Sequence, residues 1–147
     1  MPSAPINLTV GTFRDITTTT DTPRWSTVSA LEAVSTPGQD RVTVPTGTTK
    51  LIVSGSGLID LVFTILSSDT STYTPLGVWF LQTSGTEDPH GVANFSLQGI
   101  TSSTITIRNL HVNSGPATAR RKWEYYLVIQ RQDGKIGIID PDIENEN

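Results

Sequence analysis

Hydrophobic residues along this chain recur in short runs that alternate with polar positions, and turn-forming residues separate the runs. In the clearest run, residues 103–110, Ile105 and Ile107 share one face with Asn109, while threonines and an arginine occupy the other. A side-chain period of two is typical of a strand with one buried face. Turn signals recur about every 8 to 12 residues, as in sandwiches and jelly rolls. The pattern therefore predicts an all-β fold: a single antiparallel β-sandwich, jelly-roll or immunoglobulin-like, of about 8 to 10 short strands.

The runs also predict where the strands lie. We expect one domain over residues 1–147, with no internal repeat and no linker. The segment 25–34 fits either a short helix or a strand, and we favour the strand. We expect exposed loops at 14–23, 67–74 and 83–91, and strands at 6–13, 41–44, 50–54, 58–66, 76–82, 92–97, 103–110 and 123–131.

The C-terminal part of the chain predicts a β-hairpin. An apolar and aromatic run ends at Arg131, and Asp133-Gly134 follows. This dipeptide is a strong signal for a two-residue turn, because both central positions of the favoured turn need positive φ. Asp140-Pro141 is expected to end the last strand, since proline cannot donate to a ladder. Residues 144–147 are then expected to form a polar acidic tail.

The residues of this hairpin resemble a known family. Tyr-x-Leu-x-Ile from Tyr125, then Asp133-Gly134-Lys135, a short apolar strand and Asp-Pro-x-Ile ending at Ile143 are similar to the closing hairpin of bacterial inclusion-body proteins of the PixA/AidA type. The resemblance covers residues 125–143. It implies a small all-β protein made in bacterial cytoplasm, often under growth-phase or quorum control, with no assigned catalysis. The family has no established catalytic residues, so the resemblance brings no site.

Composition narrows the function classes. The 147-residue chain has no cysteine, which excludes disulfides, thiolate metal sites and a cysteine nucleophile. Its net charge of −4 gives no general attraction to nucleic acid or anionic membranes, and we expect neither as a partner. No signal peptide and no apolar run long enough to span a membrane is visible. We expect a cytoplasmic protein, with non-classical export or a phage or virion context as alternatives.

Few residues suggest catalysis, and we expect no enzyme and no cofactor. The two histidines, His90 and His111, are distant in sequence and lack metal-ligand spacing. His90 with Glu87 and Asp88 could form a metal or acid–base site in a small hydrolase, although a polar loop explains the same residues. The glycine-rich stretch 54–57 lacks the helix and the lysine of a phosphate-binding loop, and it predicts a turn.

Aromatic and basic residues supply the candidate binding sites. Trp25 lies beside an arginine and Tyr73 lies in a polar stretch, so both are candidates to stack on sugar rings. Arg120 and Arg121 precede Trp123, and arginine and tryptophan are enriched at protein-contact hot spots. Trp79 is flanked by apolar residues, and we expect it in the core.

The lack of catalytic motifs and the aromatic residues in the predicted strands favour a non-enzymatic interaction or assembly module that self-associates or docks a protein partner. A lectin-like carbohydrate-binding domain is the alternative, and a small hydrolase or metal site around His90 is the third. The chain has only three lysines, and few can guard strand edges against pairing. We therefore expect lysine or proline at Thr9 or Thr106 to reduce the size of any edge-assembled oligomer.

Overall fold

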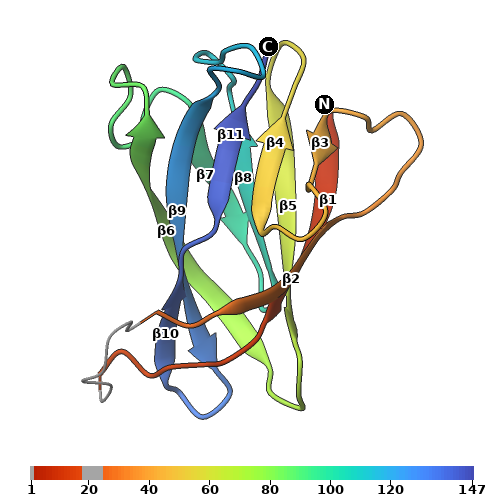
Figure 1. Ribbon diagram of the computed structural model, residues 1–147. Coiled ribbons are helices and arrows are strands. Elements are labelled where there is room, and N and C mark those ends of the chain that lie inside the picture. The colour runs from red at the N-terminus through yellow and green to blue at the C-terminus, as the bar shows by residue number, and fades with distance from the viewer. Residues whose placement is uncertain (1, 18–24) are drawn as a thin grey trace.

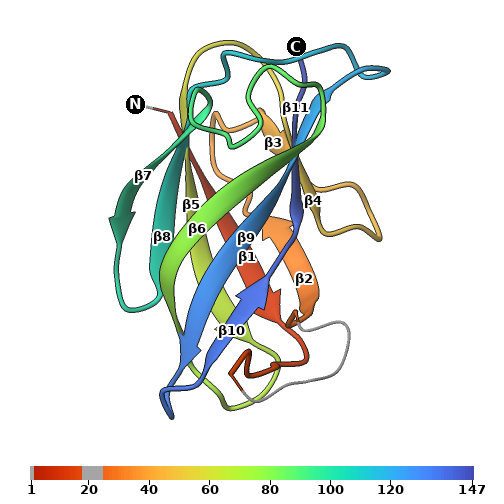
Figure 2. The ribbon, with the colours of Figure 1, turned by 90° about the vertical axis from the view of Figure 1, so that its left-hand side faces the viewer.

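The computed structural model describes residues 2–17 and 25–147 as two β-sheets packed face to face (Figures 1 and 2). The all-β prediction is confirmed. The described residues contain no helix, and hence none that could span a membrane. Their eleven strands are β1 (Ser3–Val10), β2 (Val28–Ala33), β3 (Val42–Thr43), β4 (Lys50–Val53), β5 (Ile59–Ser67), β6 (Tyr73–Ser84), β7 (Phe95–Ile100), β8 (Thr104–Asn109), β9 (Arg121–Arg131), β10 (Ile136–Ile139) and β11 (Asp142–Asn145).

The two sheets are mixed, not antiparallel as the sequence pattern predicted. The first sheet has the order β2-β1-β5-β8-β7, and β1 runs parallel to β5. In the second sheet, β9 pairs with β6 along one side and with β10 and then β11 along the other. Beyond β11 follow β4, which is parallel to it, and β3. Alternation along a strand reports which face is buried and says nothing of the partner's direction, so the parallel pairs escaped prediction.

The core forms where the inner faces of the sheets meet. Alternate residues of β1, β5, β8 and β9 are fully buried, as their hydrophobic alternation predicts. The rings of Phe63 and Tyr125, from opposite sheets, lie 5.5 Å apart and join the two layers. The members of this core on these strands are Ala4, Ile6, Leu8, Val10, Ile59, Leu61, Phe63, Ile65, Ile105, Ile107, Trp123, Tyr125, Leu127 and Ile129.

The predicted hairpin between β9 and β10 is present, but its turn is longer than expected. The backbone N–H of Arg131 donates to the carbonyl of Lys135 (2.8 Å), which leaves a three-residue loop. Within this loop only Gly134 has positive φ, at 89°. A three-residue loop that ends in a left-handed glycine is a common hairpin connection, and it uses the same Asp-Gly dipeptide.

The predicted tail is instead the strand β11. Pairing with β9 does lapse at Asp140-Pro141, but the chain then resumes beside β9 and inserts between it and β4. Glu144 is only 2% exposed and Asn145 is fully buried. The Asn145 side chain accepts a hydrogen bond from the buried Asn109 amide (2.7 Å), so the buried face of β8 has a polar partner in the opposite sheet.

Other sequence expectations have mixed outcomes. The segment 25–34 contains the strand β2, as favoured. The predicted loop 14–23 falls partly outside the described residues, and its described part, 14–17, contains no strand. Thr9 and Thr106 were expected at strand edges, but they lie on β1 and β8, each of which is paired on both sides. The edges of the first sheet are β2 and β7.

Candidate binding surface

Three aromatic side chains meet on the outer face of the second sheet. Trp79 on β6 is directly opposite Tyr126 on β9, and their rings stack with centroids 4.9 Å apart and planes 9° apart. The Trp25 ring lies 5.8 Å from Tyr126, tilted by 58°. Trp79 is 44% exposed and Trp25 is 36% exposed. We call Trp25, Trp79 and Tyr126 the aromatic platform.

Strand alternation places two of these rings outside. On β9 the inward positions are taken by Trp123, Tyr125 and Leu127, so Tyr126 faces outward. On β6 Phe80 is buried, so its neighbour Trp79 points away from the core. The expectation that Trp79 is a core residue was therefore wrong. Its run is apolar on both faces, and no alternation in the sequence reveals which side is buried.

The platform borders two shallow hollows. One, of about 370 Å³, is lined by Trp25, Trp79, Tyr126, Phe80, Leu81 and His90. The other, of about 190 Å³, is lined by residues that include Trp25, Asp140 and Pro141. Trp25 therefore lines both hollows, and an acidic residue, Asp140, lines the second.

Three carboxylates, which we call the acidic rim, border the platform: Glu124, Asp140 and Asp142. Glu124 is directly opposite Asp142 in the ladder, and it accepts a hydrogen bond from the Tyr126 hydroxyl. This bond, with a smaller contribution from burial and from the rim charges, raises the pKa of Tyr126 to about 12. Partial burial and the charge of Glu124 raise the pKa values of Asp140 and Asp142. The rim is thus a cluster of like charges that repel one another.

The nearby cations gather around a different carboxylate. The buried Glu144 lies 3.1 Å from Lys50, 3.5 Å from Arg120 and 3.8 Å from Lys122. Arg120 also pairs with Glu146 at 3.2 Å. Among the residues the structure describes, no cationic group lies within 4.0 Å of an acidic-rim carboxylate.

Replacing Asp142 with asparagine is expected to stabilise the protein at neutral pH. The folded state raises the pKa of Asp142, so its charged form is unfavourable there. This penalty is present above the raised pKa and disappears as the pH falls below the ordinary value of 3.8. Because the side chain is only partly buried and its charge is screened, we expect a gain of about 0.5 kcal/mol at pH 7 and none at pH 3 in urea unfolding.

Asp133→Asn is the matched control for this prediction. Its partner Arg131 lowers the pKa of Asp133 to about 2, so the charged form is favourable in the folded state. The control should destabilise the protein at pH 7. Equal effects of the two substitutions would contradict the repulsion assigned to the rim.

The other predicted binding residues lie elsewhere. Tyr73 was expected in a polar loop but is the buried first residue of β6, where it stacks on Phe13 at 5.6 Å. Trp123 is fully buried, and its indole N–H donates to the backbone carbonyl of Asp88 (2.9 Å). Arg121 pairs with Glu87. The predicted binding residues therefore do not form one site, and only Trp25 belongs to the platform.

His90 has no acid–base partner at the positions the sequence suggested. Glu87 pairs with Arg121, and the Asp88 carboxylate accepts hydrogen bonds from the backbone of Ala93 (3.1 Å) and the side chain of Asn94 (2.8 Å). In residues 2–17 and 25–147, no group of three or more histidine and acidic side chains is placed to hold a metal ion. His90 instead borders the apolar hollow.

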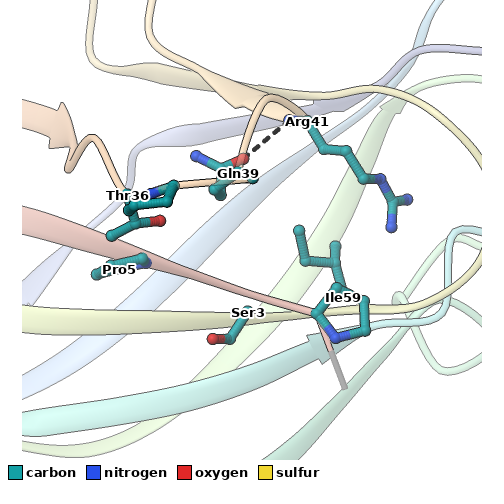
Figure 3. A pocket seen from close by; sticks show the side chains of 9 residues that line it. Ser3, Pro5, Thr36, Gln39, Arg41 and Ile59 are labelled. Atoms are coloured by element: carbon teal, nitrogen blue, oxygen red, sulfur yellow. Dashed lines mark hydrogen bonds between the residues drawn. The ribbon is translucent and has the colours of Figure 1, made fainter.

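A third hollow, also of about 370 Å³, lies away from the platform at the start of β1 and β5 (Figure 3). Arg41 lines it, but its guanidinium donates to the carbonyls of Ser54 (2.7 Å), Gly57 (2.7 Å) and Leu58 (3.2 Å). These bonds close the glycine-rich turn 54–57, which is confirmed as a turn. The arginine thus holds a loop, which occupies three of its five N–H donors.

The residues that sequence analysis missed are Trp79, Tyr126 and the acidic rim. One signal was available: the alternation from Trp123 to Ile129 already places Tyr126 on the face opposite the core. The residue across from Tyr126 depends on strand pairing and register, which the sequence alone does not provide.

No family model matches the chain, and no curated protein matches it. Among solved structures, the inclusion body protein PixA from Burkholderia cenocepacia J2315 is 11% identical, with a TM-score of 0.48 over 99% of this chain and 96% of that chain. A structure of murine CRIg is 12% identical, with a TM-score of 0.41 over 71% of this chain and 94% of that chain. Likenesses of this degree place the chain in neither family.

Proposed function

We propose that the protein is a non-enzymatic binding module that docks a protein partner on the aromatic platform. The observation that carries this proposal is the contact of three aromatic rings on one outer sheet face, with Trp25 and Trp79 each more than a third exposed. Tryptophan and tyrosine dominate protein-contact hot spots, because a rigid ring buries much apolar area when a partner covers it. The adjacent Leu81, 43% exposed, extends the apolar surface.

The rings are already held in place before a partner binds. Trp79 and Tyr126 are fixed by the β6–β9 ladder and by their mutual stacking, and the Tyr126 hydroxyl is held by Glu124. A binding surface with pre-ordered side chains loses less conformational entropy on association. This rigidity favours a docking role.

Trp79→Ala tests the proposal, with Leu97→Ala as the matched control. Leu97 is 48% exposed on β7 of the other sheet, so its removal deletes a similar surface contact away from the platform. Each variant is purified gently from the native source and examined by native mass spectrometry. A stoichiometric protein partner found with the wild type and Leu97→Ala, and lost with Trp79→Ala, supports the proposal. A partner retained by Trp79→Ala, or a bare monomer in all three, contradicts it.

Self-association through β7 is a second candidate, favoured by the composition of that edge. Residues 91–107 contain no charged residue and no proline, and β7 carries the exposed side chains Leu97 and Ile100. Such an edge lacks the charges and prolines that discourage strand addition, although a bulge between Leu97 and Gly99 interrupts its register. An antiparallel pair of β7 strands would join the first sheets of two copies.

Leu97→Lys is expected to shift any homo-oligomer formed at this edge towards the monomer. A charge on the edge would oppose close strand pairing. Thr106→Lys adds the same charge to β8, an interior strand of the same sheet, and should leave the oligomer unchanged. Size-exclusion chromatography with light scattering measures the mass. An equal response of both variants would argue against edge pairing.

Carbohydrate binding is a further candidate, because a half-exposed tryptophan beside a carboxylate can stack on a sugar and accept from its hydroxyls. Trp25 lines a hollow that Asp140 shares. A glycan array probed with the wild type and Trp25→Ala tests this candidate. Glycan binding that is retained by Trp25→Ala would show that Trp25 is not part of the sugar-binding site.

A further inference from the structure

The electrostatic surroundings of the aromatic platform select among possible ligands. The acidic rim places three carboxylates beside Tyr126, with Glu124 in direct contact with its hydroxyl and facing Asp142 across the ladder. Asp140 lines the hollow beside Trp25. Any group that covers the platform therefore lies close to concentrated negative charge.

Lys50, directly opposite Asp142 on β4, and Lys122 offset this charge only in part, and no cation of the described chain lies within 4.0 Å of a rim carboxylate. The ion pairs of the nearby cations go to Glu144 instead, which lies two residues beyond Asp142 on β11. These cations are Lys50, Arg120 and Lys122. Opposed like charges destabilise a sheet, and Glu124 and Asp142 form such a pair. A cationic ligand would relieve this repulsion, whereas a neutral ligand would leave it and an anionic ligand would increase it.

The rings themselves also favour a cation. The face of an aromatic ring carries partial negative charge and attracts ammonium and guanidinium groups, most strongly over tryptophan. A guanidinium additionally stacks flat on a ring while its N–H groups donate to carboxylates at its edge. Trp79 with Tyr126 offers the stacking surface, and the acidic rim offers the acceptors.

We propose that the aromatic platform binds an arginine side chain of the partner protein, stacked on the exposed ring of Trp79 or Trp25 with its guanidinium directed at the acidic rim. This inference rests on the proposed function and names the chemistry of the residue that docks. The overall charge of −4 acts in the same direction, because it attracts a basic partner during approach.

The test uses a small probe whose charge can be removed without changing its shape. The probe is an acetylated and amidated peptide, Gly-Arg-Gly-Arg-Gly, and its counterpart carries neutral citrulline at both arginine positions. Binding is followed through the indole N–H resonances, which report separately on the platform tryptophans and the buried Trp123. We expect the arginine peptide to move the Trp25 and Trp79 signals and to bind about tenfold more tightly than the citrulline peptide.

The protein side is tested with the double variant Asp140→Asn, Asp142→Asn. It should bind the arginine peptide about tenfold more weakly. The matched control, Glu32→Gln with Asp69→Asn, removes the same number of charges from exposed positions away from the platform and should bind like the wild type. Both variants keep the rings, and the unfolding midpoint of each confirms that the fold is retained.

Three results would overturn the inference: equal affinity for the two peptides, unchanged affinity in Asp140→Asn, Asp142→Asn, or no shift of either platform signal up to about 10 mM peptide. The partner assay above separates this failure from failure of the proposed function. If the partner is lost with Trp79→Ala but retained by the double variant, the docking role is supported and the arginine inference is contradicted. A partner retained by Trp79→Ala would remove the docking role itself.

Discussion

Deleting residues 144–147 is expected to lower the free energy of unfolding by about 5 kcal/mol or more, enough to unfold much of the protein. The deletion removes Glu144 from among three cations and leaves Lys50 and Arg120 without their buried partner. It also removes Asn145, so the buried Asn109 amide loses its acceptor. An unsatisfied buried amide alone costs about 1 to 3 kcal/mol. Circular dichroism and urea unfolding measure the effect.

The double substitution Glu146→Ala, Asn147→Ala in the full-length chain is the control. These side chains lie at the surface, and their ion pair with Arg120 and hydrogen bond with Ser114 are expected to contribute less than about 1 kcal/mol. If the deletion also shifted stability by no more than this amount, the segment would be the dispensable acidic tail that composition suggested, and β11 would not be integral to the sheet.

Trp123→Ala is expected to destabilise the protein by about 4 kcal/mol, because it leaves a large cavity beneath β9. The indole is fully buried and meets the Phe95 ring edge-on at 5.2 Å, which connects the two sheets. Its N–H also holds the loop at Asp88. Chemical unfolding with the remaining tryptophans as probes gives the change in free energy.

Trp123→Phe separates packing from hydrogen bonding in this prediction. It keeps most of the buried volume and loses the donor to Asp88, so we expect about 1 to 2 kcal/mol of destabilisation. A stable Trp123→Ala protein that had lost only its partner would support the hot-spot role that the sequence suggested for this residue. The structure assigns Trp123 to the core instead.

Hydrophobic alternation predicted most strands because burial on one face is a local property. Ile105, Ile107 and Asn109 were assigned to one face from the sequence, and all three are buried. Tyr73 shows the limit of the same reasoning. Its neighbours are serines and threonines, so local composition suggested a loop, whereas pairing with Arg131 of β9 makes it the first residue of a strand.

The binding surface was less predictable because it depends on register between distant strands. Trp79 meets Tyr126 only through the β6–β9 ladder, and the bulge after Pro75 shifts which β6 residues face outward. The acidic rim likewise requires β11 to lie beside β9. Sequence analysis predicted a tail in place of β11, so it could not predict this pairing. Sequence analysis could identify Trp25 as a candidate, but not the two rings and three carboxylates around it.

The position of β11 also constrains when the protein can fold during its synthesis. Its parallel partner β4 begins at Lys50, about 90 residues before Asp142, so the gap between β9 and β4 stays open until β11 itself has left the ribosome. Contacts of such sequence separation slow folding, towards the range of milliseconds to seconds. During that interval the facing edges of β4 and β9 are unpaired, and such edges promote aggregation. Chaperone demand should therefore be greatest in the interval before β11 emerges.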